Sequence, residues 1–353
     1  THTLGAFLVW NKKTTKSEWW AQFVPNLSLL SRTMHYHSGN VDTTFTKRSI
    51  LYNMYSTFIK WRSTNHKYEF MFQYHVNGQA PDMNLFVNIL NTTDPLNVTM
   101  GNTNLKPSYK HELISHFLRI YPTKGLMWLI EAQYIPTVNA IAMGYTYDKA
   151  TGQRTFRPDN VNGNWKGQLA LGGAGPLTKN RKLDFKAMAE LRYEKSVDLI
   201  GLAGTSASNR SIVESLNYIG DLQLNYRLGQ SSIGFISKGN WAHVDGTRED
   251  FEAFNVSDFN YGLTAQLQLT LDFRLGTDLT MYSRRGYLDK SMNSDDLVWN
   301  ARLSRSFFKG QLTLLLDGFD ILGQLNNVTR TMNAQGITET YSNVIPRYVM
   351  LHA

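Results

Sequence analysis

Residues 263–275 carry the pattern that most restricts the fold, because apolar and polar side chains alternate there without interruption. In an extended strand successive side chains point to opposite faces, so this segment predicts one apolar and one polar face. It is longer than the ~5–6 residues of an average strand and long enough for the ~9–11 tilted residues that cross a bilayer. We therefore predict a membrane-spanning strand, with Leu267 and Leu269 facing lipid and Gln268 facing the interior.

The same alternation recurs in three further segments, residues 185–193, 222–228 and 312–317. Repeated segments with an apolar outer face and a polar inner face are the signature of a transmembrane β-barrel with a wet interior. On this pattern Leu224 and Leu314 face lipid. Asn225 and Thr313 then face the interior.

The composition of the 353-residue chain permits a barrel and argues against several other classes. Mean hydropathy is −0.34 and no run approaches the ~18 apolar residues of a membrane helix, but half of each barrel strand is polar in any case. The absence of cysteine argues against a disulfide scaffold and a thiolate metal site. The net charge of +8 is scattered, without a recognition-helix pattern or zinc-ligand spacing, so we expect no nucleic-acid partner.

Connections between the predicted strands alternate between short and long, as in bacterial outer-membrane barrels with short periplasmic turns and long outer loops. Fourteen connections imply about fifteen antiparallel strands, the first of which starts outside. Because a complete barrel has an even number of strands, we expect upstream strands to be missing. The short connections lie near residues 11–17, 63–66, 122–125, 178–181, 229–231, 276–277 and 308–310. The long ones lie near residues 38–46, 77–107, 147–160, 200–210, 246–258, 288–297 and 319–339.

All eight tryptophans lie near predicted strand ends, where an amphipathic ring suits a membrane-water interface. This placement predicts two aromatic girdles. Trp10, Trp19, Trp20, Trp61 and Trp128 lie near short turns, and Trp165, Trp241 and Trp299 lie near long loops.

Candidate chemistry is sparse, and we predict no catalytic, cofactor or metal site and no enzyme activity. His35 and His37 with Asp42 could bind a metal, but a third ligand at definite spacing is missing, which favours ordinary polar side chains. The acidic pairs at 249–250 and 295–296 could bind calcium, although solvated loop charge explains them better. Nucleophile-elbow, zinc-protease and P-loop motifs are absent from the sequence.

Three arginines, Arg274, Arg284 and Arg302, are predicted on the interior face of neighbouring strands and are the candidate ligand-binding residues. They could guide an anionic ligand. Alternatively they could fix a plug domain through ion pairs, since a plugged lumen must be lined with charge.

Several motifs resemble those of a known family. Residues 101–107, Gly-Asn-Thr-Asn-Leu-Lys-Pro, resemble the Gly-Asn-Pro-Asn-Leu-Lys-Pro-Glu motif of TonB-dependent outer-membrane receptors, from which Thr103 and Ser108 depart. Residues 160–165, 319–322 and 341–351 give further matches in the family's order. The chain is thus similar to the C-terminal barrel region of the Bacteroidota outer-membrane β-barrel family of TonB-dependent receptors.

This resemblance implies a transmembrane antiparallel barrel of about 22 strands, of which residues 1–353 would be the C-terminal part, without the plug domain and TonB box. It implies energised import of a scarce nutrient, such as a siderophore, glycan, peptide or cofactor, across a Gram-negative outer membrane. The implied partners are outer-membrane lipid and lipopolysaccharide, the TonB complex through the missing N-terminal part, a surface lipoprotein and a small or oligomeric nutrient. A passive porin and a structural or secretion-complex subunit are the alternatives.

Overall fold

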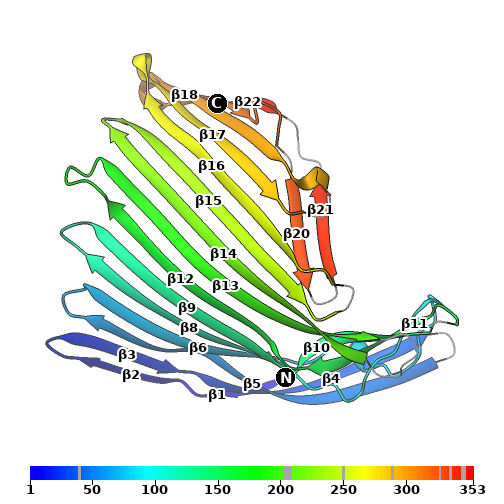
Figure 1. The fold of residues 1–353 in the computed structure, drawn as a ribbon. Coiled ribbons are helices and arrows are strands. Elements are labelled where there is room, and N and C mark those ends of the chain that lie inside the picture. Colours follow the sequence, from blue (N-terminus) through cyan, green and yellow to red (C-terminus); the bar gives the residue numbers. More distant parts are fainter. Residues whose placement is uncertain are drawn as a thin grey trace.

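The computed structural model describes residues 1–38, 41–148, 150–201, 208–248, 251–287, 290–325, 327–333, 336–342 and 347–353. It consists almost entirely of β-strands, and one large antiparallel sheet curves around an open side (Figure 1). No helix in the described ranges is long and apolar enough to span a membrane.

The large sheet contains seventeen strands. They are β1 (His2–Gly5), β2 (Leu8–Lys13), β3 (Ser17–Phe23), β4 (Pro25–Ser38), β5 (Val41–Ser63), β6 (Tyr68–Gln79), β8 (Ser108–Tyr121), β9 (Leu126–Val138), β12 (Asn164–Pro176), β13 (Leu183–Gly201), β14 (Ser208–Leu228), β15 (Ser231–Gly246), β16 (Phe254–Gln268), β17 (Phe273–Arg285), β18 (Asp295–Phe307), β19 (Leu312–Phe319) and β22 (Tyr348–His352). Smaller sheets contain β7 (Asn97–Thr99), β10 (Ala140–Tyr147) and β11 (Arg154–Val161), and β20 (Asn327–Asn333) with β21 (Gly336–Ser342). Four 3-10 turns are η1 (Met83–Phe86), η2 (Thr270–Asp272), η3 (Lys290–Met292) and η4 (Phe308–Gly310).

Successive strands pair with one another, so the sheet is a meander. β1 and β2 are two pieces of one edge strand, which pair with β4 and β3, and both β3 and β4 pair with β5. The seventeen strands therefore occupy fifteen positions, which confirms the predicted antiparallel meander. Within the described ranges no strand register joins β2 to β22, and the two outer edges stand apart in Figure 1.

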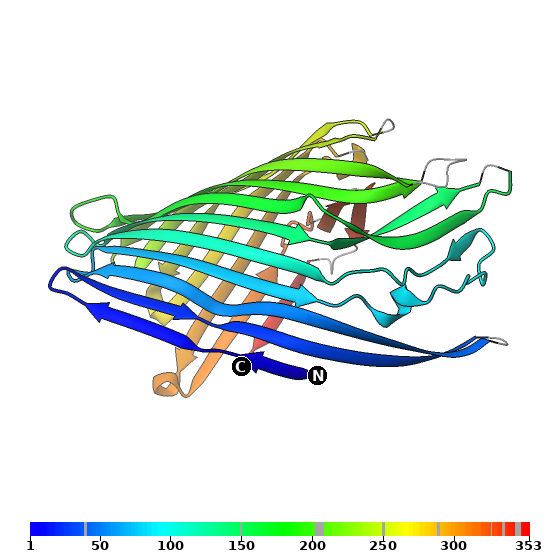
Figure 2. The same ribbon diagram turned by 90° about the horizontal axis from the view of Figure 1, so that it is seen from below.

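Short and long connections are segregated to opposite ends of the sheet, as predicted (Figure 2). We call these ends the short-turn end and the long-connection end. Glycine allows tight turns at the short-turn end. Gly229 has a φ of +64° in the two-residue link between β14 and β15, and Gly125 has a φ of +67° in the link between β8 and β9. At the other end the connections fold into η1, β7, β10, β11 and the β20–β21 hairpin.

The prediction of one strand over residues 263–275 is wrong. β16 ends at Gln268, η2 follows, and Leu271 and Asp272 have φ values of +60° and +58°. The alternation conceals this turn because the four intervening residues are an even number, so Leu267 and its cross-strand partner Leu275 remain on one face. The turn predicted at 276–277 is also wrong, since both residues lie inside β17.

Leu269 therefore lies in a turn at the short-turn end, and its predicted lipid-facing position within a strand is wrong. The other predictions of which side chains face lipid and which face the interior agree with the strand registers. Leu224 pairs with Phe235, which pairs with Leu263 on one face, whereas Asn225 pairs with Gly234 on the other.

The described parts of three predicted long loops contain strand residues. β4 and β5 pair up to Ser38 and Val41, β13 and β14 pair up to Gly201 and Ser208, and the segment 147–160 contains most of β11. The sequence of these strand ends is typical of loops because it is rich in Thr, Ser, Asn, Asp and Gly, although the backbones still pair. Parts of the predictions for 38–46, 147–160, 200–210, 246–258, 288–297, 319–339 and 341–351 lie outside the described residues, as does the acidic pair 249–250.

The buried side chains gather at the long-connection end. One cluster joins β10 and β11 to β13 through Ala142, Val161, Val197 and Leu199. Others surround Val244 and Tyr287 beneath the links after β15 and β17. The described parts of these connections therefore pack against the wall.

Candidate functional site

The two faces of the sheet differ in chemistry, and cross-strand registers show which side chains share a face. On the apolar face, Leu263 of β16 lies opposite Phe235 of β15 and Leu279 of β17, and both leucines are exposed. On the polar face, Asp221 lies opposite Lys238, and Lys238 lies opposite Asn260. In a membrane barrel the polar face lines the lumen, which makes it the candidate site.

The positive charge of Arg302 is neutralised by a carboxylate on the neighbouring strand. Its Nε lies 2.5 Å from Asp317 Oδ1 and its Nη2 donates to Asp317 Oδ2 at 3.1 Å. The carboxylate of Asp317 is buried and also lies 3.1 Å from His352 Nε2. Neighbouring strands thus supply the partners of Arg302 without a plug domain.

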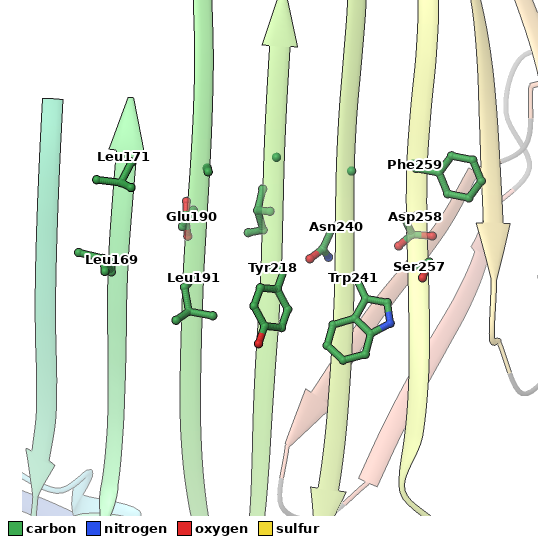
Figure 3. Close-up of a pocket in the computed structure, with 14 residues that line it drawn as sticks. Leu169, Leu171, Glu190, Leu191, Tyr218, Asn240, Trp241, Ser257, Asp258 and Phe259 are labelled. Atoms are coloured by element: carbon green, nitrogen blue, oxygen red, sulfur yellow. The ribbon is translucent and has the colours of Figure 1, made fainter. Parts of the chain in front are cut away.

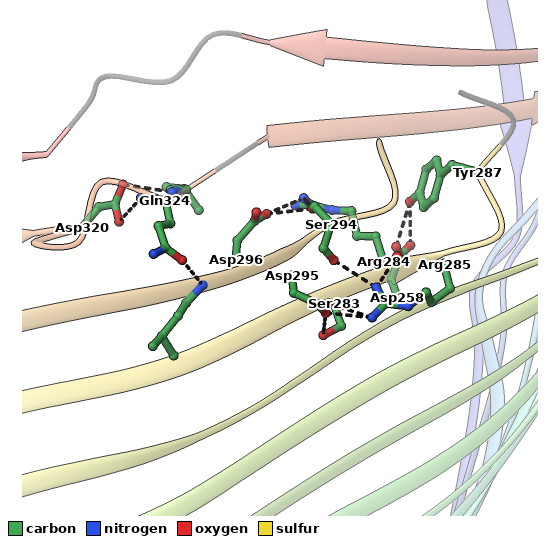
Figure 4. Close-up of polar contacts among 12 residues, drawn as sticks. Asp258, Ser283, Arg284, Arg285, Tyr287, Ser294, Asp295, Asp296, Asp320 and Gln324 are labelled. Carbon is green, nitrogen blue, oxygen red and sulfur yellow. Dashed lines mark hydrogen bonds and ion pairs between the residues drawn. The ribbon is translucent and has the colours of Figure 1, made fainter. Parts of the chain in front are cut away.

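Arg284 is also paired within the wall (Figure 4). Its Nη1 donates to Asp296 Oδ2 at 2.9 Å and to Ser294 Oγ at 3.2 Å. Arg285 and Asp295, one residue away on each strand, form a second ion pair at 2.8 Å on the opposite face. The acidic pair 295–296, predicted as loop charge, therefore begins β18 and is held by two arginines.

Arg274 differs from the other two arginines. Its Nε donates to Gln268 Oε1 at 3.2 Å, and among the described residues it has no ion pair with a carboxylate. Arg274 and Arg302 line one hollow of about 440 Å³ on the polar face. Arg284 lies ten residues further along β17, roughly 33 Å away at strand spacing. The structure thus brings two of the three predicted arginines together and separates the third.

Near Arg284 the structure forms a second polar hollow, of about 290 Å³, that the sequence did not predict. Asn240 Oδ1 is enclosed there and has no hydrogen-bond partner among the described residues. Asp258 accepts hydrogen bonds from Tyr287 Oη at 2.8 and 2.9 Å (Figure 4). The sequence does not predict this hollow, because its residues come from separate strands and only the strand register brings them together. The lining also includes Lys238, Asn260 and Tyr282.

Comparison with known proteins agrees with this geometry. Residues 56–353 match the model of the outer membrane protein beta-barrel family. The chain belongs to this family. No curated protein and no solved structure matches the chain. Family membership and the meander of fifteen positions together identify a wall of an outer-membrane β-barrel. The narrower resemblance to TonB-dependent receptors stays a prediction.

In this outer-membrane barrel, the motif at residues 101–107 organises the connection between β6 and β8 at the long-connection end. Gly101 donates its N–H to Val87 O at 2.8 Å, and a Cβ at this position would lie 2.5 Å from the same oxygen. Asn102 Nδ2 donates to Pro158 O at 3.0 Å, and Lys47 Nζ donates to Thr103 O at 2.6 Å. The motif therefore ties the connection to the β10–β11 hairpin and to β5.

The motif at residues 319–322 has a similar role. Asp320 accepts hydrogen bonds at 3.0 Å from the backbone N–H groups of Gln324 and Leu325, which closes the turn after β19 (Figure 4). Gln324 Oε1 in turn accepts from Leu297 N at 3.0 Å. Both motifs thus stabilise the long-connection end of the barrel.

Two other predicted groups do not join the polar site. His35 Nδ1 lies 2.9 Å from Thr44 Oγ1, and His37 lies opposite Asp42 near the tip of the β4–β5 hairpin. Within the described ranges, no group of three or more potential metal-ligating side chains converges.

A hollow of about 580 Å³ lies on the apolar face (Figure 3). It exists because Ala189, Gly220 and Gly239 are adjacent across three strands and leave a gap between larger neighbours such as Leu171 and Trp241. This position is on the opposite side of the wall from the polar site. It does not contribute to a path through the lumen.

Tryptophan rings support the predicted girdles. Trp128 contacts Phe185 near the short-turn end, and Trp165 contacts Tyr134 and Tyr193 nearer the long-connection end. Trp20 differs, because it pairs with Lys60 on the polar face and Arg62 lies over its ring.

Proposed function

We propose that the protein is the wall of an outer-membrane transporter that imports a nutrient into the periplasm, energised through the TonB complex. The observation that carries this proposal is the polar face, which is wide, lined with charged and amide side chains, and bordered by ordered connections at one end. Barrels of about 22 strands leak unless their lumen is filled, so we propose a plug domain in the whole protein. We propose no enzyme activity.

The hollow at Arg284 supports a first binding step near the long-connection end. Its carboxylate, amide and phenol groups suit a ligand rich in hydrogen-bonding groups, and the enclosed Asn240 Oδ1 lacks a donor that such a ligand could supply. Arg274, towards the short-turn end, supplies a cation without a carboxylate partner in the described wall. We propose that it meets an anionic group of the ligand or of the plug. Lipopolysaccharide and a surface lipoprotein remain proposed partners outside the wall.

Energised uptake can be tested with cells that express the whole protein. Under conditions in which growth on a nutrient requires this protein, uptake of that nutrient should stop when an uncoupler collapses the proton-motive force. Asn240→Leu should weaken uptake at low nutrient concentration, whereas Asn225→Leu, on the same face but outside this hollow, should not. Continued uptake after collapse would contradict energised transport and favour a passive porin.

A conductance measurement distinguishes energised transport from a passive porin independently. In planar bilayers the intact protein should conduct little, because a plug fills the lumen. A variant that lacks the plug should conduct strongly. High conductance from the intact protein would overturn the proposal.

A further inference from the structure

Positive charge is concentrated at the short-turn end. Within three residues of the seven short connections lie fourteen of the 36 Lys and Arg residues but four of the 28 Asp and Glu residues. The rest of the chain is therefore close to neutral. Lys13, Arg62 and Arg227 have carboxylate partners, and among the described residues the other eleven cations at this end have none. A surface with so many unpaired cations favours an anionic partner.

Two arginines at this end have the same unusual surroundings on the apolar face. The guanidinium of Arg119 lies 4.0 Å from the ring centre of Tyr68 across the strand and 4.7 Å from that of Tyr121 two residues on. The guanidinium of Arg305 lies 5.0 and 4.7 Å from the ring centres of Phe273 and Phe307, in the same relative positions. β8 and β18 are far apart in the sheet, so the wall builds this arrangement twice.

Among the described residues, no carboxylate neutralises either arginine. The Nε of each is enclosed without a hydrogen-bond partner, and within the described ranges neither side chain forms an ion pair. The rings fix the plane of each guanidinium, while its terminal nitrogens are not enclosed. A planar fork of this kind binds phosphate oxygens through paired hydrogen bonds.

The position of Arg119 and Arg305 indicates which molecule would supply a phosphate group to them. Both lie two residues before a strand ends and on the face that meets lipid, and exposed Trp128 pairs with Arg119. Aromatic rings beside cations mark the depth where acyl chains give way to headgroups. Because short turns face the periplasm, this is the phospholipid leaflet on the periplasmic side.

We propose that Arg119 and Arg305 each bind the phosphate of an anionic phospholipid, and that the surrounding lysines enrich such lipids around the short-turn end. This inference depends on the membrane orientation of the wall and not on nutrient transport. A failed uptake experiment would leave it standing, and a failed lipid experiment would leave transport standing.

Tryptophan quenching tests the proposal with the whole protein in vesicles. Brominated phosphatidylglycerol should quench emission at lower mole fraction than brominated phosphatidylcholine, because Trp128 lies beside Arg119. Arg119→Gln should reduce this preference roughly fivefold, and Arg305→Gln should do the same in a variant with Leu303→Trp, which places a reporter ring two residues from Arg305 on the same face. Arg119→Lys should keep part of it, since it retains charge and loses the fork.

Arg227→Gln is the matched control. It removes one positive charge from the same end, but Arg227 is paired with Asp184 and lies on the polar face. The control should keep the wild-type preference. An equal loss in this control would show general charge attraction and overturn the two sites.

Three other outcomes would also overturn the proposal. One is equal quenching by the two lipids in the wild-type protein. Another is displacement of the brominated phosphatidylglycerol by inorganic phosphate at matched concentration, which would point to a free anion. The last is binding of an acidic protein at this end without any lipid preference. Heat-modifiable migration on gels checks that each variant has folded.

Discussion

The two ends of the barrel wall use charge differently. At the long-connection end, arginines and aspartates on β17 and β18 are paired, and the pairs help to fix the hairpin. At the short-turn end, most cations have no carboxylate partner among the described residues, and two are held between aromatic rings. Paired charges contribute to architecture, whereas unpaired charges remain available for a partner. The exposed apolar band separates the two ends.

The largest effect should come from breaking the buried pair. Asp296→Ala leaves the Arg284 guanidinium, which is 14% exposed, without its main carboxylate partner and should reduce the free energy of unfolding by about 3–5 kcal/mol. Asp295→Ala is the neighbouring control: its pair with Arg285 is about half exposed, so the loss should be much smaller. Urea unfolding in detergent measures both. Equal losses would show that burial does not distinguish the pairs.

Charge placed in the band between the ends should have the next largest effect. Leu222→Arg puts a guanidinium on the apolar face of β14 and should cost ~2–4 kcal/mol near the membrane midplane. Gln223→Arg, one residue on, points to the polar face and should be tolerated. Unfolding from lipid vesicles gives the difference. If both variants behave alike, the two faces are assigned incorrectly.

The order of the long-connection end depends on Gly101. A Cβ there would lie 2.5–2.7 Å from backbone atoms of Val87 and Leu85, so Gly101→Ala should displace the connection at a cost of about 1–3 kcal/mol. Faster protease cleavage within residues 80–107 would report this. At Gly220 an added Cβ meets nothing within 4 Å, so Gly220→Ala should leave cleavage unchanged. Unchanged cleavage in Gly101→Ala would mean that the motif does not order the connection.

Acid should produce the smallest effect, and we expect it in two turns at the long-connection end. The pKa of Asp94 is lowered by a hydrogen bond from the Asn97 side chain, and that of Asp148 by one from the Ala150 backbone. A lowered pKa contributes stability above the ordinary value of 3.8, and this contribution is lost as pH falls through the lowered value. Protection from hydrogen exchange in these turns, measured against the intrinsic exchange rate at each pH, should thus stay high at pH 5 and fall below pH 3.8. Short turns that contain no acidic residue, such as residues 122–125 and 229–230, should show no such change. Faster exchange already at pH 5 would contradict the lowered values.

Periodicity and connection length in the sequence alone determined the antiparallel meander of about fifteen positions, the two chemically distinct faces and the segregation of short and long connections. These features repeat along the chain, and each depends on local neighbours. The turn at 269–272 could not be predicted from the sequence, because a four-residue link preserves the alternation of apolar and polar side chains. Only the tertiary structure decided which arginines are neutralised and which polar groups share a hollow. Arg302 meets Asp317, Arg284 meets Asp296 and Arg119 meets Tyr68 through strand register, and register depends on backbone pairing between segments that composition does not link.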